Sequence, residues 1–253
     1  MSVKASWPEG VARHVLASVD STSAQAARLA AAGLTSPAWV LAGEQTAGKG
    51  RRGRPWASPR GNFYASLVMQ PAEPPEQVAL RSFAAALALR EALVGLTGLP
   101  QVFALKWPND VLLNGGKLAG ILLESTGANG RLGNLVIGIG VNLTTAPDPA
   151  EVEPGAVTPV SLLAETGLRI TPEAFLDALA PAYARWEAVF TTYGFAPLRD
   201  EWLRHAARLG QTIRARTGTQ TRTGIFETVD ATGALVLTTP EGRVAIPAAE
   251  VFF

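Results

Sequence analysis

Apolar and polar positions along the first part of the chain predict strands and helices in alternation. Val15, Ala17 and Val19 lie at every second position, as on one face of a strand. The run from Asp20 to Ser23 consists of residues that cap helix N-termini, and an alanine-rich helix is expected at 24–32. The next expected elements are a buried strand at 38–42, a strand at 63–69 and a helix at 76–95. This helix has apolar residues on all its sides, so we expect it to be buried.

Residues 102–143 show the pattern strand, turn, strand, strand. Asn114-Gly115-Gly116 predicts a hairpin turn, and 132–143 is a long run rich in β-branched residues. Four prolines and three acidic residues predict a loop at 145–160. Helices are expected after this loop, at about 172–193 and 197–207.

The composition changes after Leu209, where threonine, valine and glycine dominate. Turn sequences at 230–233 and 240–242 separate short apolar runs, which predicts a small β-barrel. The expected fold is therefore α+β, with a mixed central sheet packed with helices in residues 1–208 and a small β domain in 209–253.

The charge and cysteine content exclude several classes of function. The 253 residues include 22 basic and 21 acidic side chains, and 47% are apolar, so the chain is globular and lacks the basicity of nucleic-acid-binding proteins. It has no cysteine, which excludes disulfides, thiolate metal sites and thiol nucleophiles. With only two histidines, no metal site is assigned.

No segment predicts export or membrane insertion. The N-terminal residues lack the apolar core of a signal peptide, and no run approaches the ~18 apolar residues that span a bilayer. We therefore expect a cytoplasmic protein that does not contact membranes.

A glycine-rich, basic segment follows the strand at 38–42. Gly48-Lys49-Gly50-Arg51-Arg52-Gly53 matches G-x-G-x-x-G, but prolines 55 and 59 forbid the helix that a dinucleotide site requires. Positions 49–60 hold five basic residues and no acid, namely Lys49, Arg51, Arg52, Arg54 and Arg60. This favours a mobile loop that clamps phosphate or carboxylate, with Trp56 beside it to stack on a purine. The alternatives are a solvated surface loop or a nucleic-acid contact.

Polar residues also interrupt the predicted strands. Lys106-Trp107-Pro108-Asn109-Asp110 lies at a strand end and contains poor strand formers. Lys117 begins an otherwise apolar strand, so its ammonium either reaches solvent or meets an anionic ligand. Gly138 and Gly140 lie inside a strand, which indicates that another group approaches the backbone closely.

Taken in order, these segments resemble the motifs of biotin protein ligases, in particular biotin–[acetyl-CoA-carboxylase] ligases. The matching motifs are Ser21-Thr22, Gly48 to Arg54, Lys106 to Asp110, Lys117 to Leu122 and Gly138 to Asn142. The resemblance implies a class II synthetase-like biotin/lipoate ligase domain followed by an SH3-like β-barrel. It also implies an ATP-dependent, AMP-forming ligase that converts biotin and Mg-ATP (cofactors ATP and Mg²⁺) to biotinyl-5′-AMP. A lysine of a biotin carboxyl carrier protein then attacks this intermediate.

The resemblance also implies roles for individual residues. The biotin ureido ring would be bound by Ser21, Thr22 and Gln45, and the carboxylate and phosphate by Gly48, Lys49, Arg51 and Lys117. The pocket lining would include Gly120, Ile121, Gly138 and Gly140. Arg51 and Lys117 would bind ATP as well as biotin. Trp56 and Asn142 would face adenine, and Arg54 would lie near the ATP phosphates. Lys117, Arg51 and Asp110 would be catalytic, with Asp110 orienting or deprotonating the acceptor lysine.

Two departures from the family motifs matter, and one further feature distinguishes this chain from the longer members. Lys49 stands where the family usually has arginine, which replaces a fork of donors by a point charge. Ser23 replaces a common asparagine, and we interpret Ser23 as part of the helix cap. Only about a dozen residues precede the first strand, too few for the helix-turn-helix of longer members, so neither DNA binding nor a repressor role is expected.

Two other functions and one assembly remain open at this point. A lipoate–protein ligase shares the chemistry, but its RR-x-x-G-G-G signature is missing whereas Lys-Trp-Pro-Asn-Asp is present. A nucleic-acid-binding module would need exposed aromatics in the β domain, which offers only Phe226, Phe252 and Phe253. A free edge of the central sheet would suit a homodimer, although no residue decides between monomer and dimer.

Overall fold

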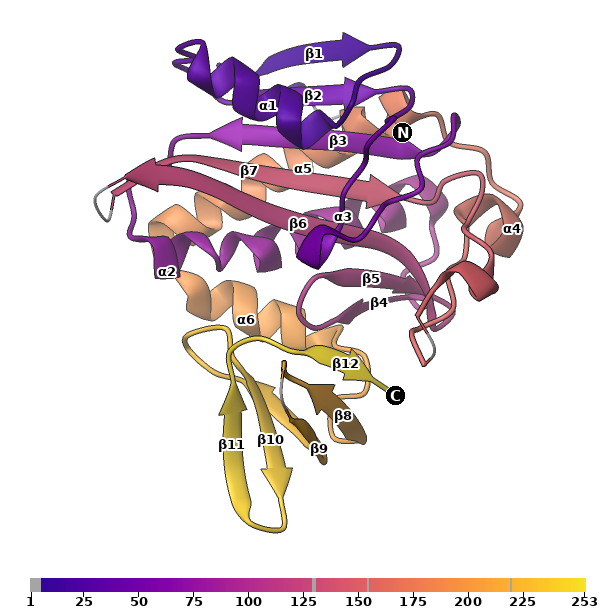
Figure 1. Ribbon diagram of the computed structural model, residues 1–253, viewed down its shortest axis with the longest axis vertical. Coiled ribbons are helices and arrows are strands. Elements are labelled where there is room, and N and C mark those ends of the chain that lie inside the picture. The colour runs from indigo at the N-terminus through magenta and orange to yellow at the C-terminus, as the bar shows by residue number, and fades with distance from the viewer. Residues whose placement is uncertain (1–5, 129–130, 154, 219) are drawn as a thin grey trace.

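The centre of the molecule is a seven-stranded sheet with the order β1-β2-β3-β7-β6-β5-β4 (Figure 1). The computed structural model describes residues 6–128, 131–153, 155–218 and 220–253. Neighbouring strands are antiparallel, except that β1 and β2 are parallel. The strands are β1 (Ala12–Leu16), β2 (Ala38–Ala42), β3 (Phe63–Met69), β4 (Phe103–Lys106), β5 (Asp110–Leu113), β6 (Gly116–Ala128) and β7 (Arg131–Val141).

Helix α1 (Thr22–Ala31) covers one face of this sheet. It packs on β2, β3 and β7, and its buried Ala26 has too small a side chain to hold the helix away from the strands. Ser21 caps the helix by accepting a hydrogen bond from the amide of Ala24. The interpretation of Ser23 as a cap is therefore wrong, because Ser23 lies within the first turn and its hydroxyl faces the sheet, bonded to Ser66.

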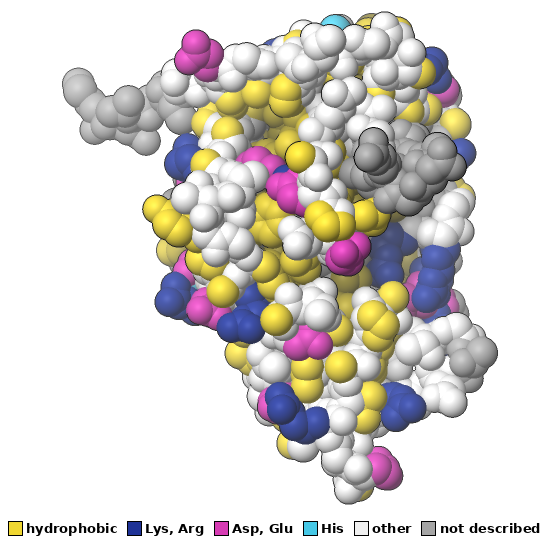
Figure 2. Space-filling model, turned by 90° about the vertical axis from the view of Figure 1, so that its left-hand side faces the viewer, with side chains coloured by type: hydrophobic (Ala, Val, Ile, Leu, Met, Phe, Trp, Pro, Cys, Tyr) yellow, Lys and Arg dark blue, Asp and Glu magenta, His cyan; other side chains and the backbone are white. Residues whose placement is uncertain are grey.

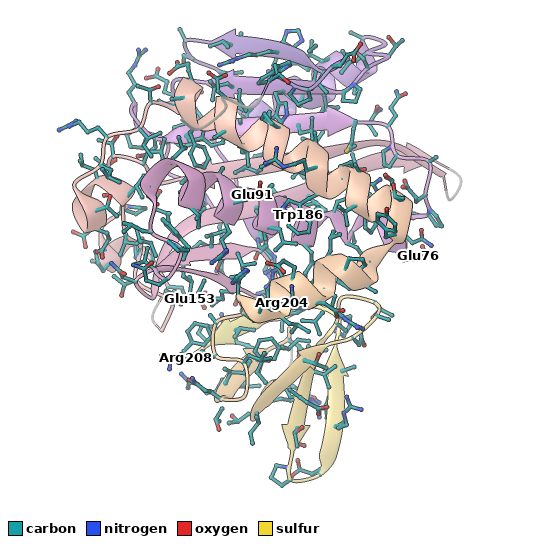
Figure 3. All side chains as sticks on the ribbon, turned by 180° about the vertical axis from the view of Figure 1, so that it is seen from behind. Glu76, Glu91, Glu153, Trp186, Arg204 and Arg208 are labelled. Atoms are coloured by element: carbon teal, nitrogen blue, oxygen red, sulfur yellow. The ribbon has the colours of Figure 1, made fainter. Side chains whose placement is uncertain are left out.

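The opposite face is covered by α3 (Arg81–Thr97) and α5 (Pro172–Tyr193), which pack against each other. Every residue from Phe83 to Leu89 is buried, as expected for this helix. A hydrogen bond of 2.9 Å from Nε1 of Trp186 to Glu91 joins the two helices (Figure 3). The single helix expected at 76–95 is wrong in one respect: a separate turn, α2 (Pro75–Val78), precedes α3.

Three further differences concern the ends of elements. The first strand begins earlier than expected, at Ala12, and a short helix, α4 (Leu162–Thr166), was not expected after the proline-rich loop. Single turns of 3₁₀ helix, η1 (Arg51–Gly53) and η2 (Pro149–Glu151), lie in the two loops, and α6 (Phe195–Arg204) begins and ends slightly before the expected range. No helix in the described ranges is both long and apolar enough to cross a membrane.

The C-terminal region forms a separate antiparallel sheet of five strands, in the order β11-β10-β9-β8-β12. The strands are β8 (Thr212–Arg216), β9 (Thr221–Val229), β10 (Leu235–Thr239), β11 (Gly242–Ile246) and β12 (Glu250–Phe252). Trp202 of α6 stacks edge-on against Phe226, and Nε1 of Trp107 donates to the carbonyl of Gly233 at 3.0 Å. These contacts fix the small sheet beside the β4–β5 connection, where β12 borders the cavity described next (Figure 1).

Candidate active site

A cavity of about 870 Å³ lies on the α1 side of the central sheet. Its floor comes from β6 and β7, one end from the start of α1, and its rim from four segments distant in sequence. These segments are the glycine-rich loop, the β4–β5 connection, the 145–160 loop and β12. The volume lies within the usual range for small-molecule and cofactor sites.

Two facing positions on the floor of the cavity are glycines, so no side chain projects from them into the cavity. Gly120 of β6 lies directly opposite Gly140 of β7, and the indole of Trp56 lies over both. A Cβ atom on Gly140 would lie 2.6 Å from Trp56, and one on Gly120 would lie 3.2 Å from it. The close approach expected at Gly138 and Gly140 is therefore confirmed. The approaching group is Trp56 at Gly140 and the Ser23 hydroxyl at Gly138.

Hydroxyl and amide groups gather at the end of the cavity beside α1. Gln45 Oε1 accepts from the backbone N–H of Thr22 at 2.9 Å and from its hydroxyl at 3.1 Å. The Thr22 hydroxyl lies 2.8 Å from that of Ser66, which is fully buried on β3, and the Ser23 hydroxyl lies 3.1 Å from the same Ser66 oxygen. Ser21, Thr22 and Gln45 therefore lie together, as expected, and Ser23 joins them.

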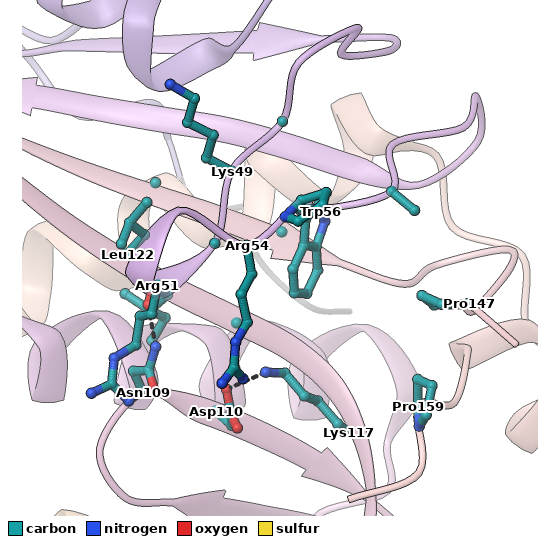
Figure 4. A pocket seen from close by; sticks show the side chains of 18 of the residues that line it. Lys49, Arg51, Arg54, Trp56, Asn109, Asp110, Lys117, Leu122, Pro147 and Pro159 are labelled. Atoms are coloured by element: carbon teal, nitrogen blue, oxygen red, sulfur yellow. Dashed lines mark hydrogen bonds and ion pairs between the residues drawn. The ribbon is translucent and has the colours of Figure 1, made fainter. Parts of the chain in front are cut away.

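The middle of the cavity carries a cluster of charged side chains, of which Asp110 and Lys106 are buried (Figure 4). The Asp110 carboxylate forms an ion pair of 2.8 Å with Lys117 and one of 3.6 Å with Lys106. Burial alone would raise the pKa of Asp110, but Lys117, Lys106 and Arg51 outweigh it and hold that pKa below its usual range. Burial also lowers the pKa of Lys106, opposed by Asp110. Lys117 therefore does meet an anion, although the anion is a carboxylate of the chain.

Arg51 reaches the same cluster from the glycine-rich loop. Its guanidinium donates to Oδ1 of Asn109 at 3.3 Å, and Asn109 in turn donates to the carbonyl of Ile121 at 2.5 Å (Figure 4). Burial lowers the pKa of Arg51, partly offset by Asp110. Arginine stays protonated under such a shift, so Arg51 presents a partly desolvated positive charge to the cavity.

Arg52 and Arg54 of this loop are paired with carboxylates from distant segments. Arg54 forms ion pairs of 2.7 Å with Glu250 on β12 and 2.8 Å with Glu153, and Arg52 lies 3.1 Å from Glu250. Arg216 on β8 pairs with the same two carboxylates. Sequence reasoning found no acid for this loop, because both partners are about a hundred or more positions further along the chain.

Comparison with known proteins gives the family. A model described as the biotin/lipoate A/B protein ligase family matches residues 15–142, and one for the biotin protein ligase C-terminal domain matches 209–253. The biotin–[acetyl-CoA-carboxylase] ligase of Paracoccus denitrificans is 58% identical over 94% of this chain and 99% of its own length. The chain belongs to the biotin protein ligase family.

Other relatives of this ligase agree in sequence and fold. The bifunctional ligase/repressor BirA of Bacillus spizizenii is 32% identical over 92% of this chain and 71% of its own length. The biotin protein ligase of Aquifex aeolicus, solved in complex with biotin and ATP, superimposes with a TM-score of 0.82 at 27% identity. That match covers 95% of this chain and 97% of the other. The α+β fold with a small C-terminal β domain is thus confirmed.

All the residues expected in the ligase site line this one cavity. Its lining includes Ser21, Thr22, Gln45, Gly48, Lys49, Arg51, Arg54, Trp56, Asp110, Lys117, Gly120, Ile121, Gly138, Gly140 and Asn142. Lys49 points away from the Asp110–Lys117 pair (Figure 4). Asn142 donates to the carbonyl of Val160, which ties the end of β7 to the neighbouring loop.

Four further residues were missed from the sequence: Ser66, Lys106, Glu153 and Glu250. Lys106 was recognisable as part of the Lys-Trp-Pro-Asn-Asp motif, whereas the others carry no local signal. In the part of the chain that the structure describes, no group of three or more His, Asp or Glu side chains is arranged to hold a metal ion.

Proposed function

We propose that this chain activates biotin with ATP to biotinyl-5′-AMP in this cavity and then transfers biotin to a lysine of a biotin carboxyl carrier protein. The observation that carries the proposal is the arrangement of three groups in one cavity. Hydroxyl and amide groups occupy one end, Lys117 and Arg51 the middle, and Trp56 lies over the glycine floor. Biotin needs polar contacts to its ureido ring, cations at its carboxylate and an adenine site beyond it.

In the first half-reaction, a biotin carboxylate oxygen attacks the α-phosphorus of ATP and pyrophosphate leaves. Both reactants are anions, and negative charge builds up on the phosphoryl oxygens in the transition state. Lys117 and Arg51 stabilise this charge. Asp110 holds the Lys117 ammonium at 2.8 Å, so little reorganisation is needed when the substrates arrive.

The nucleotide is held on the Trp56 side of the cavity. The indole rests on Gly120 and Gly140 and offers its other face to adenine, where aromatic stacking supplies affinity. Arg54 then exchanges its carboxylate partners for phosphate oxygens. When bound to ATP, Mg²⁺ neutralises phosphate charge. Among the described residues, no group of three or more His, Asp or Glu side chains could hold the ion.

In the second half-reaction, the amine of the acceptor lysine attacks the carbonyl carbon of biotinyl-5′-AMP, and AMP leaves. The attacking amine must lose a proton. Asp110, which is ionised and lies in the cavity lining, orients this amine and accepts the proton. Lys117 stabilises the departing phosphate.

The proposal also specifies the acceptor protein and the cellular location, and it excludes DNA binding. The acceptor is a carrier protein, the location is the cytoplasm, and binding of DNA is not part of the function. On the face shown in Figure 2, Lys and Arg side chains are interrupted by acidic, apolar and neutral ones, so the described part of that face carries no continuous basic stripe. We also propose that two copies of the chain pair through a free edge of the central sheet, which a measurement of the oligomeric state tests.

Native mass spectrometry tests this function directly. The protein is incubated with Mg-ATP and an equimolar mixture of biotin, lipoate and octanoate. We expect a retained mass equal to biotinyl-5′-AMP, without covalent attachment to the chain. A retained lipoyl-AMP would contradict the biotin assignment and favour a lipoate ligase, and no adduct with any acid would contradict adenylation. The same spectrum gives the oligomeric state.

A further inference from the structure

The hydroxyl groups at the α1 end of the cavity belong to a chain of hydrogen bonds. This chain includes residues that the family resemblance does not assign to biotin. The chain runs from Ser23 through Ser66 and Thr22 to Gln45. Gln45 Nε2 lies 2.9 Å from the Ser58 hydroxyl, which lies 2.9 Å from the carbonyl oxygen of Trp56. One end lies in the cavity and the other is the main chain of the loop that carries the indole.

The direction of each hydrogen bond follows from which groups can donate. The backbone N–H of Thr22 can only donate, so the atom of Gln45 that it meets is Oε1, and Nε2 must face Ser58. The Trp56 carbonyl can only accept, so the Ser58 hydroxyl donates to it and accepts from Gln45. This half of the chain is therefore fixed.

The other half is fixed by the same reasoning. A hydroxyl has a single hydrogen, and Thr22 must use its hydrogen on Gln45 Oε1, because a carbonyl oxygen cannot donate. Thr22 therefore accepts from Ser66, and Ser66, having used its hydrogen, accepts from Ser23. All three hydroxyl hydrogens are used inside the chain.

We propose that this directed chain makes the α1 end of the cavity a hydrogen-bond acceptor, with Ser23 accepting from a ring N–H of biotin. Ser66 and Ser58 are then positioning residues that fix the direction without touching the ligand. The proposal rests on the function proposed above. A ureido ring offers two N–H donors, whereas the dithiolane ring of lipoate offers none, so the chain contributes to the choice of acid.

The packing around the chain leaves it little freedom to rearrange. Ser66 is fully buried, and a Cβ atom on the neighbouring Gly138 would lie 2.7 Å from the Ser23 oxygen. At the other end, a Cβ atom on Gly48 would lie within 2.8 Å of Ser58, Gln45 and the Trp56 carbonyl. Glycine is therefore required at both ends for the hydroxyl and amide groups to meet.

The test compares biotin binding by calorimetry in the full chain and in hydroxyl-deletion variants. Ser66→Ala and Ser58→Ala each raise the Kd for biotin about threefold to tenfold, the effect of one neutral hydrogen bond. Their kcat for adenylate formation changes less than twofold, because neither hydroxyl touches the reacting carboxylate. Ser58→Thr keeps a hydroxyl on the loop and restores the affinity of the wild type.

Thr97→Ala is the matched control. Its hydroxyl donates to the carbonyl of Leu93 at 2.7 Å near the end of α3, away from the cavity, so its loss leaves biotin affinity unchanged. If Ser66→Ala fails to fold, Ser58→Ala and Ser58→Thr carry the test. A Kd unchanged in Ser58→Ala, or not restored in Ser58→Thr, would overturn the proposal.

A ligand variant tests the donor role of the biotin ring. For one of the two mono-N-methylated biotins, methylation weakens binding to the wild type but causes no further loss in Ser23→Ala. Strictly additive losses for both isomers would refute the contact with Ser23. If the wild type itself does not bind biotin, the proposed function fails. If it binds biotin and forms biotinyl-5′-AMP while the variants behave like the wild type, only the directed chain fails.

Discussion

The Cβ-free floor beneath Trp56 leads to a sharp prediction for Gly140→Ala. The new methyl group would lie 2.6 to 2.8 Å from Cε2, Nε1 and Cζ2 of the indole. Carbon atoms prefer about 3.5–4.0 Å, so the two groups must separate by about 1 Å. β7 cannot supply this movement, because Gly140 pairs with Tyr64 on one side and Gly120 on the other. The indole must move instead.

The expected size of the effect follows from the cost of overpacking. Inserting a methyl group into a packed site costs about 1–3 kcal/mol. If this cost falls on the adenine-stacking position of Trp56, the KM for ATP rises roughly fivefold to 150-fold, since 1.4 kcal/mol corresponds to a factor of about ten. The assay is biotin-dependent exchange of labelled pyrophosphate into ATP at varied ATP concentration.

Gly120→Ala is the matched control for this prediction. Its methyl group would lie 3.2 Å from the edge of the same ring, which a shift of a few tenths of an ångström relieves, so a much smaller rise in KM is expected. Trp56→Phe replaces the indole, including the three contacting atoms, by a smaller ring, so adding Gly140→Ala to Trp56→Phe should have little further effect. A KM for ATP within twofold of the wild type in Gly140→Ala would refute the reasoning.

Three other predictions concern the charged cluster. Lys117→Ala keeps the fold but lowers the rate of adenylate formation by at least about 10²–10³-fold, because it removes a group that stabilises transition-state charge; normal pyrophosphate release would contradict its role. Arg51→Gly loosens the loop, so biotinyl-5′-AMP escapes and biotinylates bystander lysines of added serum albumin, which streptavidin blotting detects. Labelling confined to the carrier protein would show that Arg51 does not clamp the intermediate. The pKa of Asp110 lies below its ordinary value in the folded state, so its ion pairs stabilise the fold above about pH 4 and lose this effect as the pH falls through the folded-state pKa. The difference in urea midpoint between wild type and Asp110→Asn should therefore be larger at pH 7 than at pH 3, and an equal difference would contradict the lowered pKa.

Much of the central sheet was predictable because its patterns are local. The strands expected at 38–42 and 63–69 have the same bounds in the structure, since each is an apolar run that ends at residues unsuited to strands. The strand glycines of β7 also indicated the close approach correctly. In contrast, the break before α3 lies in a continuous helical run with apolar residues on all sides, and α4 has only five residues, too few for a periodicity to emerge.

The parts of the site that were missed depend on long-range contacts or on helix register. Glu250 reaches the loop from β12 of the C-terminal sheet and Glu153 from the 145–160 loop, and nothing in their local sequence indicates either contact. Ser23 follows two other good cap residues, so the sequence alone could not tell which of them begins the helix. Once Ser21 takes that position, the register of α1 turns Ser23 toward the sheet.

The alternation along β7 also determines how tolerant this site is of insertions and deletions. Gly138 and Gly140 form the floor of the cavity, while Ile137, Ile139 and Val141 belong to the hydrophobic core on the other face. Because side chains alternate between faces, inserting one residue before Gly138 would bring isoleucines under the ligand and glycines into the core. Such a variant would lose folding and binding together, so a scan of single-residue insertions should find few variants of β7 that are folded but inactive.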